Sequence, residues 1–396
     1  MTEETPHQFL VVGKRFVQKG THEKATGEAK YYVDINLPGM LYAKILRSPH
    51  AHAMVKRIDV SRAKKLPGVH AVLTYKDVGH IRAMEEAVLE ERVRYVGDKV
   101  AAVAAESEDI AEEALELIDV EYEVLPAVFD PEEAIKPGAP ILHPDIIKAG
   151  PWAGVFGVPR DRVPPRVRDM PNLKTYTEYT VGDVEKGFKE ADYVFEDRYT
   201  TQRQCQCCPE THVSVASWDS DGKLTFWVSA QGLQGARSFV AGALKMPESM
   251  VRVIIPAMGG GYGGKAPFME DVVCALLAKE AGRPVKLERT REEEFTTVRT
   301  RQFCVFYMKT GVKKDGTITA RYMKSIIDTG AYGHAFVIAE RAAAWFMTPY
   351  SCPNYKYEGY SIYTNTTNTS GFRGHSSVPD HWPMESHMSR IAEEIG

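Results

Sequence analysis

The 396-residue sequence has few cysteines, little net charge and no long hydrophobic run. No stretch approaches the roughly eighteen apolar residues of a membrane-spanning helix, and residues 1–9 (MTEETPHQF) lack the apolar centre of a signal peptide. Six cysteines without a paired CxxC spacing exclude a disulfide scaffold. The 49 basic and 53 acidic side chains leave a net charge of -4, which does not favour nucleic acid. We therefore expect a cytoplasmic protein without a membrane or nucleic-acid partner.

Familiar hydrolase motifs are also missing. The sequence contains no HExxH and no GxSxG, which argues against a zinc hydrolase and a serine hydrolase of the nucleophile-elbow type. With 44% hydrophobic and 26% charged residues, the composition is that of a folded globular protein long enough for two or three domains.

Three segments differ in their residue patterns. Residues 1–136 carry short β-branched or aromatic runs bounded by Pro and Gly, with a helical pattern at 109–117, and predict an α/β domain. Residues 137–180 are proline-rich with little periodicity, and we interpret them as a linker or arm. Residues 181–396 again alternate between strand and helix patterns, including an amphipathic helix at 270–281. The chain is predicted to be α+β.

The sequence closes with a predicted amphipathic helix at 384–395. Its apolar face contains Met388, Ile391 and Ile395. Because a domain rarely finishes on such a helix, we expect this face to pack on something outside the chain.

A glycine-rich run at 258–265 (MGGGYGGK) lies between a predicted strand and a predicted helix. Glycines permit positive φ and allow backbone N–H groups to approach an anionic ligand. The P-loop pattern would need Ser or Thr at Ala266, and the dinucleotide pattern GxGxxG is matched only loosely. The run is interpreted as a ligand-binding loop, with a flexible hairpin or bulge as the alternative.

A second candidate stretch, at 369–377 (TSGFRGHSS), places an arginine and a histidine among glycines. Arg373 could offer a charged fork to an oxyanion or cofactor, and His375 an aromatic face or a proton carrier. Either residue alone is equally compatible with a surface loop.

Arg341 lies in an otherwise apolar segment, so we expect it to be buried. A buried guanidinium needs an acceptor, and Glu340, Glu270 or a substrate oxygen could supply it.

Three cysteines, Cys205, Cys207 and Cys208, lie within four residues. Together with His212 they could ligate a soft metal, but CxCC cannot easily wrap one tetrahedral ion. Small buried apolar residues near a strand edge are the alternative, and their role is left open.

In their order along the chain, these stretches resemble the first half of the molybdenum-binding large subunit of the xanthine dehydrogenase and aldehyde oxidase family. Those that resemble its hammerhead-like α/β domain are 27–31 (GEAKY), 47–53 (RSPHAHA), 95–98 (YVGD) and 103–106 (VAAE). Those that resemble its molybdopterin site are 204–212, 258–265 and 371–375 (GFRGH). The resemblance implies a hammerhead-like α/β domain over 1–136 and a first molybdopterin-binding α+β domain over 181–396.

The resemblance also implies roles for single residues. Gln204, six positions before Glu210, matches the glutamine that hydrogen-bonds the apical molybdenum oxygen. Tyr262 stands where the family commonly has Phe, and Arg373 matches the arginine whose loop packs beside the metal ligands. These three would therefore lie around molybdenum without ligating it. The remaining cofactor contacts implied are Gly260, Gly261, Gly263, Phe372 and Gly374.

Arg341, in the segment Glu340-Arg341-Ala342, resembles the arginine that stabilises charge on the substrate oxygen in purine-oxidising members. The resemblance thus assigns Arg341 and Gln204 to catalysis, and Arg341, His375 and Ala266 to substrate binding. Purine oxidisers have an acid at the position of Ala266 and a Phe at that of His375. These departures favour a substrate with a carboxylate or ring carbonyl but a donor pattern unlike that of xanthine.

The catalytic Glu of this family, and the loops that grip the pterin dinucleotide, lie in the second half of the large subunit, beyond this sequence. The resemblance therefore implies a split enzyme similar to nicotinate dehydrogenase. A partner subunit would carry the second molybdopterin domain and the general base, and further subunits the iron–sulfur clusters and FAD. The implied cofactor is molybdenum with molybdopterin, in a dinucleotide form.

The implied activity is that of a molybdenum-dependent dehydrogenase that hydroxylates an electron-poor carbon of a purine- or nicotinate-like N-heteroaromatic. Two alternatives stay open: an aldehyde- or aromatic-oxidising member of the family, and a noncatalytic subunit for cofactor assembly. A third alternative, a CxCC metal carrier, would need Cys207 and Cys208 to hold metal.

Overall fold

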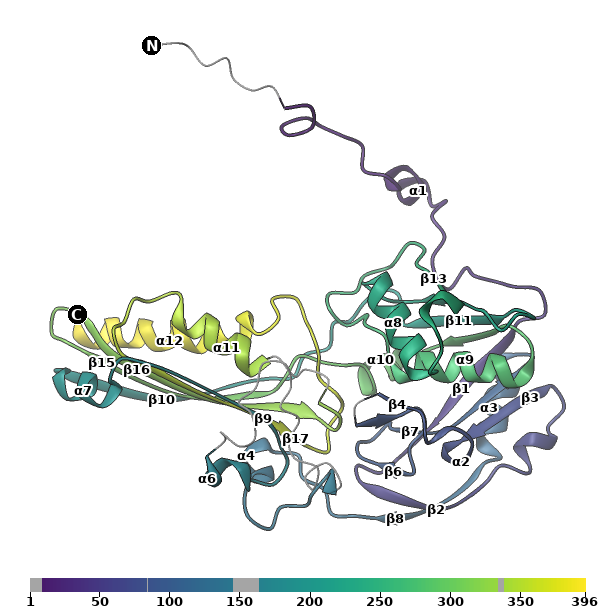
Figure 1. The fold of residues 1–396 in the computed structure, drawn as a ribbon, viewed down its shortest axis with the longest axis horizontal. Helices are drawn as coiled ribbons and strands as arrows, with labels where there is room; N and C mark the ends of the chain where they lie inside the picture. The colour runs from purple at the N-terminus through teal and green to yellow at the C-terminus, as the bar shows by residue number, and fades with distance from the viewer. Residues whose placement is uncertain (1–8, 84, 145–163, 334–337) are drawn as a thin grey trace.

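The computed structural model describes residues 9–83, 85–144, 164–333 and 338–396. Two predictions fall on residues outside these ranges. They are the absence of a signal peptide at residues 1–8 and the part of the predicted arm at residues 145–163. The chain forms two lobes, and the N-terminal segment with α1 (Thr21–Thr26) leads away from both (Figure 1). Within the described ranges, no helix has both the length and the apolar character needed to cross a membrane.

The first lobe is built on a seven-stranded sheet. Its strands, in spatial order, are β13 (Val251–Ile254), β12 (Leu224–Val228), β11 (Val213–Trp218), β14 (Val285–Glu288), β1 (Leu41–Arg47), β7 (Lys99–Ala105) and β3 (Val69–Thr74). The parallel pairing of β1 with β14 joins strands from the two predicted domains into one sheet.

The middle of this sheet is buried on both faces. In β7 (KVAAVAA), Ala102 and Ala104 pack in one core with α8 (Leu233–Ala243) and α9 (Met269–Ala281), whereas Ala101 and Val103 face a second core. Small side chains on both faces explain why β7 reads as one apolar run without alternation.

The second core lies under a three-stranded sheet of β6 (Arg92–Val93), β2 (Ala53–Asp59) and β8 (Asp119–Val124). The remaining elements of this lobe are η1 (Ala63–Lys65), α2 (Tyr75–Val78), β4 (Arg82–Ala83), β5 (Glu86–Ala87), α3 (Glu108–Glu116), η3 (Glu248–Met250) and α10 (Arg291–Thr296).

The second lobe is a five-stranded sheet with helices on both faces (Figure 1). Its strands, in spatial order, are β10 (Tyr193–Thr201), β15 (Cys304–Val312), β16 (Ile318–Gly330), β17 (Tyr355–Tyr363) and β9 (Leu173–Val181). Its helices are α4 (Pro131–Ala134), α6 (Pro165–Arg168), α7 (Val184–Glu190), α11 (Ile338–Met347) and α12 (Ser377–Ile395). The prediction of an α+β chain is confirmed, but all of β9 except its last residue falls inside the predicted arm, where no strand was expected.

The prediction for the last helix is wrong in part. Helix α12 begins at Ser377 and not at Met384. Pro379 lies in the first turn, where a helix needs no backbone N–H donor, and Pro383 is accommodated inside the helix. Ile391 is buried inside the chain, and α12 packs on β10, β15 and α11, while Met388 and Ile395 are half-buried. The apolar face therefore has an intramolecular partner.

Buried polar contacts join the two lobes. The Tyr332 hydroxyl donates to Asp98 at 2.5 Å, and the carboxylate of Glu85 accepts from the Lys174 ammonium at 3.0 Å and the Tyr363 hydroxyl at 2.5 Å. Because each of these groups is buried, the contacts hold the lobes in one relative position.

Candidate functional site

The stretches predicted to form a site meet where the lobes meet. The glycine loop, residues 258–265, joins β13 to α9 in the first lobe, and residues 371–375 join β17 to α12 in the second. Gln204 follows β10, and it pairs with Arg301 just before β15 in an isolated β-bridge.

Backbones of the two glycine-containing loops touch. The Arg373 N–H donates to the Tyr262 carbonyl at 2.9 Å. Gly263 has a φ of +96°, and a Cβ atom placed there would lie 2.6 Å from the Gly371 oxygen. Only glycine meets both conditions, so the sequence at 263 is dictated by this close approach.

Glu210 anchors the glycine loop from below. One carboxylate oxygen accepts from the Gly259 N–H at 2.8 Å and from the Lys265 ammonium at 2.7 Å, and the other accepts from the Tyr32 N–H at 3.2 Å. Lys265 is fully buried, and a buried ammonium requires such a partner. Sequence reasoning did not assign Glu210 this role, although the lysine that ends the glycine run was a signal that a carboxylate must be near.

Gln206 fills the space between the two loops. Its side-chain N–H groups donate to the carbonyl oxygens of Arg299 and Gly371, both at 2.9 Å. A Cβ atom on Gly264 would lie 2.9 Å from the Gln206 amide carbon. Position 206 carried no sequence signal that distinguished it from its neighbours.

Arg301 connects Gln204 to the second loop. It donates to the Gln204 side-chain oxygen at 3.1 Å and to the Arg373 and Gly374 carbonyls at 2.7 and 3.4 Å, and its guanidinium lies 4.5 Å from the Phe372 ring centre. Since arginine only donates, the Gln204 amide must present its oxygen to Arg301 and keep its NH₂ group for another acceptor. Burial lowers the pKa of Arg301. This residue was missed because RTRQ reads as a surface segment.

Arg341 is exposed, so the prediction that it is buried is wrong. Helix α11 turns its apolar side chains, such as Ala342 and Phe346, into the core and leaves Arg341 on the other side. The predicted pairing with Glu270 is also wrong, because Glu270 binds Arg47 and Arg289. The side chain of Glu340 lies outside the described part of the structure.

The observed partner of Arg341 is His375, whose Nδ1 lies 2.8 Å from the guanidinium. Burial, and then the positive charges of Arg341 and Arg301, lower the pKa of His375 to about 4. The imidazole is therefore neutral near pH 7, with Nδ1 as acceptor and the proton on Nε2. That Nε2 atom is buried and has no hydrogen-bond partner among the described residues.

Ala266 directly follows the glycine loop, and its N–H donates to the Gly264 carbonyl at 2.9 Å. Its predicted contact with substrate stays a prediction.

The three neighbouring cysteines contact backbone oxygens. Cys205 lies 3.5 Å from the Glu294 carbonyl, and Cys208 lies 3.5 Å from the Gly261 carbonyl. His212, suggested as a fourth ligand, binds the Glu294 carboxylate at 2.7 Å. In the part of the chain that the structure describes, no group of three or more His, Cys, Asp and Glu residues is placed to hold a metal ion.

The junction suits an oxygen-rich anionic group. Among the residues that the structure describes, none accepts a hydrogen bond from the backbone N–H groups of Gly260, Gly261 and Tyr262. The exposed Arg373 guanidinium and the Gln204 NH₂ group add donors beside them. Such a row of donors fits phosphoryl and oxo oxygens, as a molybdenum pterin would present them.

Family models match both lobes. A model of the molybdopterin cofactor-binding domain matches residues 167–396, and one of the aldehyde oxidase and xanthine dehydrogenase a/b hammerhead domain matches residues 26–126.

Related sequences and structures cover nearly the whole chain. The nicotinate dehydrogenase large molybdopterin subunit of Eubacterium barkeri is 34% identical, over 98% of this chain and 87% of that protein. A probable subunit of xanthine dehydrogenase from Bacillus subtilis is 37% identical, over 94% of this chain but 48% of that protein. The crystal structure of quinoline 2-oxidoreductase from Pseudomonas putida 86 superposes with a TM-score of 0.85 and 28% identity, over 97% of this chain and 48% of that one.

The chain thus spans about half the length of two of these three relatives and most of the third. A domain model over residues 167–396 and a relative of comparable length show that the chain belongs to the xanthine dehydrogenase and aldehyde oxidase family of molybdenum-dependent oxidoreductases.

Proposed function

We propose that this chain is the molybdopterin-binding subunit of a molybdenum hydroxylase that oxidises an electron-poor carbon of an N-heteroaromatic substrate. The observation that carries the proposal is the junction itself. Residues separated by up to 170 positions, from Gln204 to Gly374, are tied together by Arg301 and by direct contact between the two loops.

The backbone N–H groups of Gly260, Gly261 and Tyr262, with the Arg373 side chain, would hold molybdenum and its molybdopterin in a dinucleotide form. When bound, this group supplies the two-electron oxidation and the oxygen transfer. Gly263 allows the two loops to touch, and Phe372 and Gly374 are held by Arg301 through its contacts with the Phe372 ring and the Gly374 carbonyl.

Gln204 would orient the cofactor through its side-chain NH₂ group. Because Arg301 engages the amide oxygen, the amide cannot rotate without losing that hydrogen bond. The free donor is thereby held in one direction, and a donor held in place beforehand stabilises a developing negative charge more than a mobile one.

Arg341 and His375 would bind the substrate. The exposed Arg341 guanidinium keeps N–H groups beyond the one that faces His375 Nδ1. Because His375 Nε2 is buried, the neutral imidazole would offer its aromatic face to the substrate and not its N–H. This pair suits a flat ring that carries a carboxylate or carbonyl oxygen. Ala266 stands where purine-oxidising members have an acidic residue, so the substrate would meet an uncharged side chain at this position.

The catalytic Glu and the rest of the pterin pocket would come from a partner subunit, with iron–sulfur and FAD subunits carrying the electrons away. The comparable length of the Eubacterium relative, which is named as a subunit, supports this arrangement. Six free thiols suit a reducing compartment, and we place the complex in the cytoplasm.

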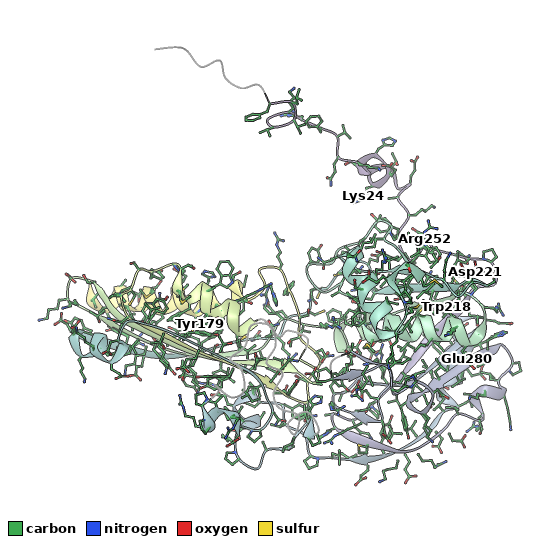
Figure 2. The ribbon with its side chains drawn as sticks, in the orientation of Figure 1. Lys24, Tyr179, Trp218, Asp221, Arg252 and Glu280 are labelled. Carbon is green, nitrogen blue, oxygen red and sulfur yellow. The ribbon has the colours of Figure 1, made fainter. Side chains whose placement is uncertain are left out.

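The test is to purify the chain with its copurifying subunits and to assay nicotinate-like and purine-like heterocycles. We expect Arg341→Ala to lower turnover by about two to three powers of ten while molybdenum content stays at the wild-type level. The matched control is Arg252→Ala, because Arg252 is an exposed arginine on the surface of the first lobe (Figure 2). This variant should change neither turnover nor molybdenum content. Loss of metal or of assembly in Arg341→Ala would instead make Arg341 a structural residue.

An aldehyde substrate is the second candidate. It is favoured by the match to the aldehyde oxidoreductase of Desulfovibrio gigas, with a TM-score of 0.84 and 27% identity. Adding an aliphatic aldehyde to the same assay separates the two, because such a substrate lacks the ring that would lie against His375.

A further inference from the structure

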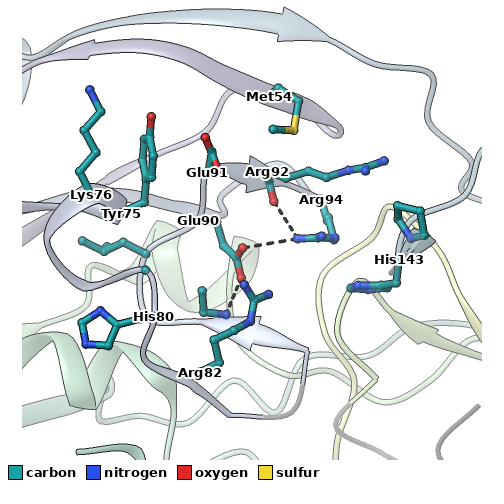
Figure 3. Close-up of a pocket in the computed structure, with 14 residues that line it drawn as sticks. Met54, Tyr75, Lys76, His80, Arg82, Glu90, Glu91, Arg92, Arg94 and His143 are labelled. Carbon is teal, nitrogen blue, oxygen red and sulfur yellow. Dashed lines mark hydrogen bonds and ion pairs between the residues drawn. The ribbon is translucent and has the colours of Figure 1, made fainter. Parts of the chain in front are cut away.

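A large charged cavity lies in the first lobe, away from the loop junction. Its volume is about 710 Å³, within the range of small-molecule sites. Figure 3 shows part of its lining, which includes Tyr75 and Lys76 of α2, Glu91, Arg92 and Arg94, and His143. None of these residues takes part in the site proposed above.

The deepest part of the cavity is a buried ion pair. Arg94 donates to the Glu90 carboxylate at 3.4 Å and to the Leu142 and Arg92 carbonyls at 3.0 and 2.8 Å. The second Glu90 oxygen accepts from the Ala87 N–H at 2.6 Å. These bonds hold both side chains in place and cancel their charges.

Positive charge prevails around this pair. The lining contains four cationic side chains, Lys76, Arg82, Arg92 and Arg94, but two carboxylates, Glu90 and Glu91. The excess of two positive charges stands in contrast with the net charge of -4 of the whole chain.

Lys76 and Arg82 are the exposed cations of the cavity. The Lys76 ammonium lies 5.9 Å from the Tyr75 ring centre, and Arg82 donates to the Glu85 backbone carbonyl. The ion pairs of the described residues in this region are Arg94 with Glu90, Lys99 with Glu86 and Asp98, and Lys174 with Glu85, and they do not include Lys76 or Arg82. Their charges are thus available to an anion from solution.

Uncharged walls complete the cavity. Tyr75, Met54 and Leu89 form apolar surface, and burial keeps the pKa of His143 well below its usual range, so that its imidazole is neutral. His143 is fixed by a 2.6 Å hydrogen bond to the Ala331 carbonyl.

We infer that this cavity binds a small molecule that carries two or more phosphoryl or carboxylate charges. The charges would lie against Lys76 and Arg82, and the apolar remainder against Tyr75 and Met54. Arg94, paired with Glu90, is the fixed cation of the interior. The site is independent of the proposed enzymatic function.

Calorimetric titration of the purified complex with pyrophosphate, and separately with citrate, tests the inference. At constant ionic strength we expect one probe bound per chain. The double variant Lys76→Gln/Arg82→Gln should weaken binding by about tenfold or more, since two charge contacts are lost. Tight binding of pyrophosphate alone would identify a phosphoryl ligand, and similar binding of both probes would identify a general multivalent anion site.

The control double variant is Lys189→Gln/Arg252→Gln, which removes the same charge from exposed positions on α7 and β13. It should bind both probes as the wild type does. The inference is overturned if neither probe saturates the complex, if binding survives in Lys76→Gln/Arg82→Gln, or if the control loses it equally. Unchanged melting temperatures without probe verify that both variants are folded.

Discussion

At residue scale, the pair of Arg341 and His375 decides what the second loop can do. From the sequence alone, His375, which lies among glycines, could be a proton carrier. Burial first, and then the charges of the neighbouring guanidiniums, keep its imidazole neutral instead.

The low pKa of His375 predicts how stability depends on pH. Its folded pKa, about 4, lies below the ordinary value of 6.5, so the unfolded chain takes up a proton between these values and the folded chain does not. Relative to His375→Gln, the wild type should lose about 2 kcal/mol as pH falls from 6.5 to 4, allowing for partial exposure. Urea unfolding at several pH values measures this. A constant difference between the two proteins would contradict it.

Turnover and molybdenum content should depend on the positions of the Arg301 N–H donors and not on its charge alone. Arg301→Lys keeps the charge but cannot reach Gln204 and the Arg373 carbonyl together, so we expect turnover or molybdenum content to fall by about 10- to 100-fold. Metal analysis and kinetics of the purified complex measure both. Arg252→Lys is the matched control, and wild-type values in Arg301→Lys would show that the fork is dispensable.

At the scale of elements, strong patterns were predictable and weak ones were not. The helix expected at 270–281 is α9 at Met269–Ala281, because its capping groups are local: Asp271 accepts from the Phe268 N–H, and Gly282 takes the left-handed conformation. Strand β9 was missed because its pairing partner, β17, lies about 180 residues away and no local signal reports it.

The contact between the two loops predicts that a methyl group added at Gly263 destabilises the protein. Gly263→Ala would place a Cβ 2.6 Å from the Gly371 oxygen at a φ of +96°, so the loops must separate. We expect a cost of about 1–3 kcal/mol and loss of bound molybdenum, measured by thermal unfolding and metal analysis. Gly235→Ala, in α8 with open space around it, should be neutral or slightly stabilising. Equal behaviour of the two variants would refute the close contact.

At the scale of the whole molecule, buried ion pairs join segments that are far apart in sequence. Glu270 on α9 accepts from Arg47 of β1 at 2.9 Å and from Arg289 after β14 at 2.7 Å. Although burial opposes its charge, the two guanidiniums lower its pKa to about 2.

Glu270→Gln would leave the buried Arg289 guanidinium without its carboxylate and Arg47 with Glu293 as its remaining one, at a cost of about 3–5 kcal/mol near pH 7. Because the folded pKa is depressed, this stabilisation is complete above pH 4.5 and is lost as pH falls toward 2. The difference between variant and wild type in denaturant unfolding should therefore shrink over that range. Glu280→Gln, an exposed residue of the same helix (Figure 2), should have little effect at any pH.

The sequence by itself determined the family, the α+β class, the glycine loop and the second loop, because these depend on local composition and on the order of motifs. It also placed Gln204, Tyr262 and Arg373 among the candidates. Tertiary structure alone decided that Arg341 is exposed and bound to His375, that Arg301 ties the loops together, and that the last helix packs within the chain. Those outcomes depend on which faces and charges meet across long sequence separations, and no single segment carries that information.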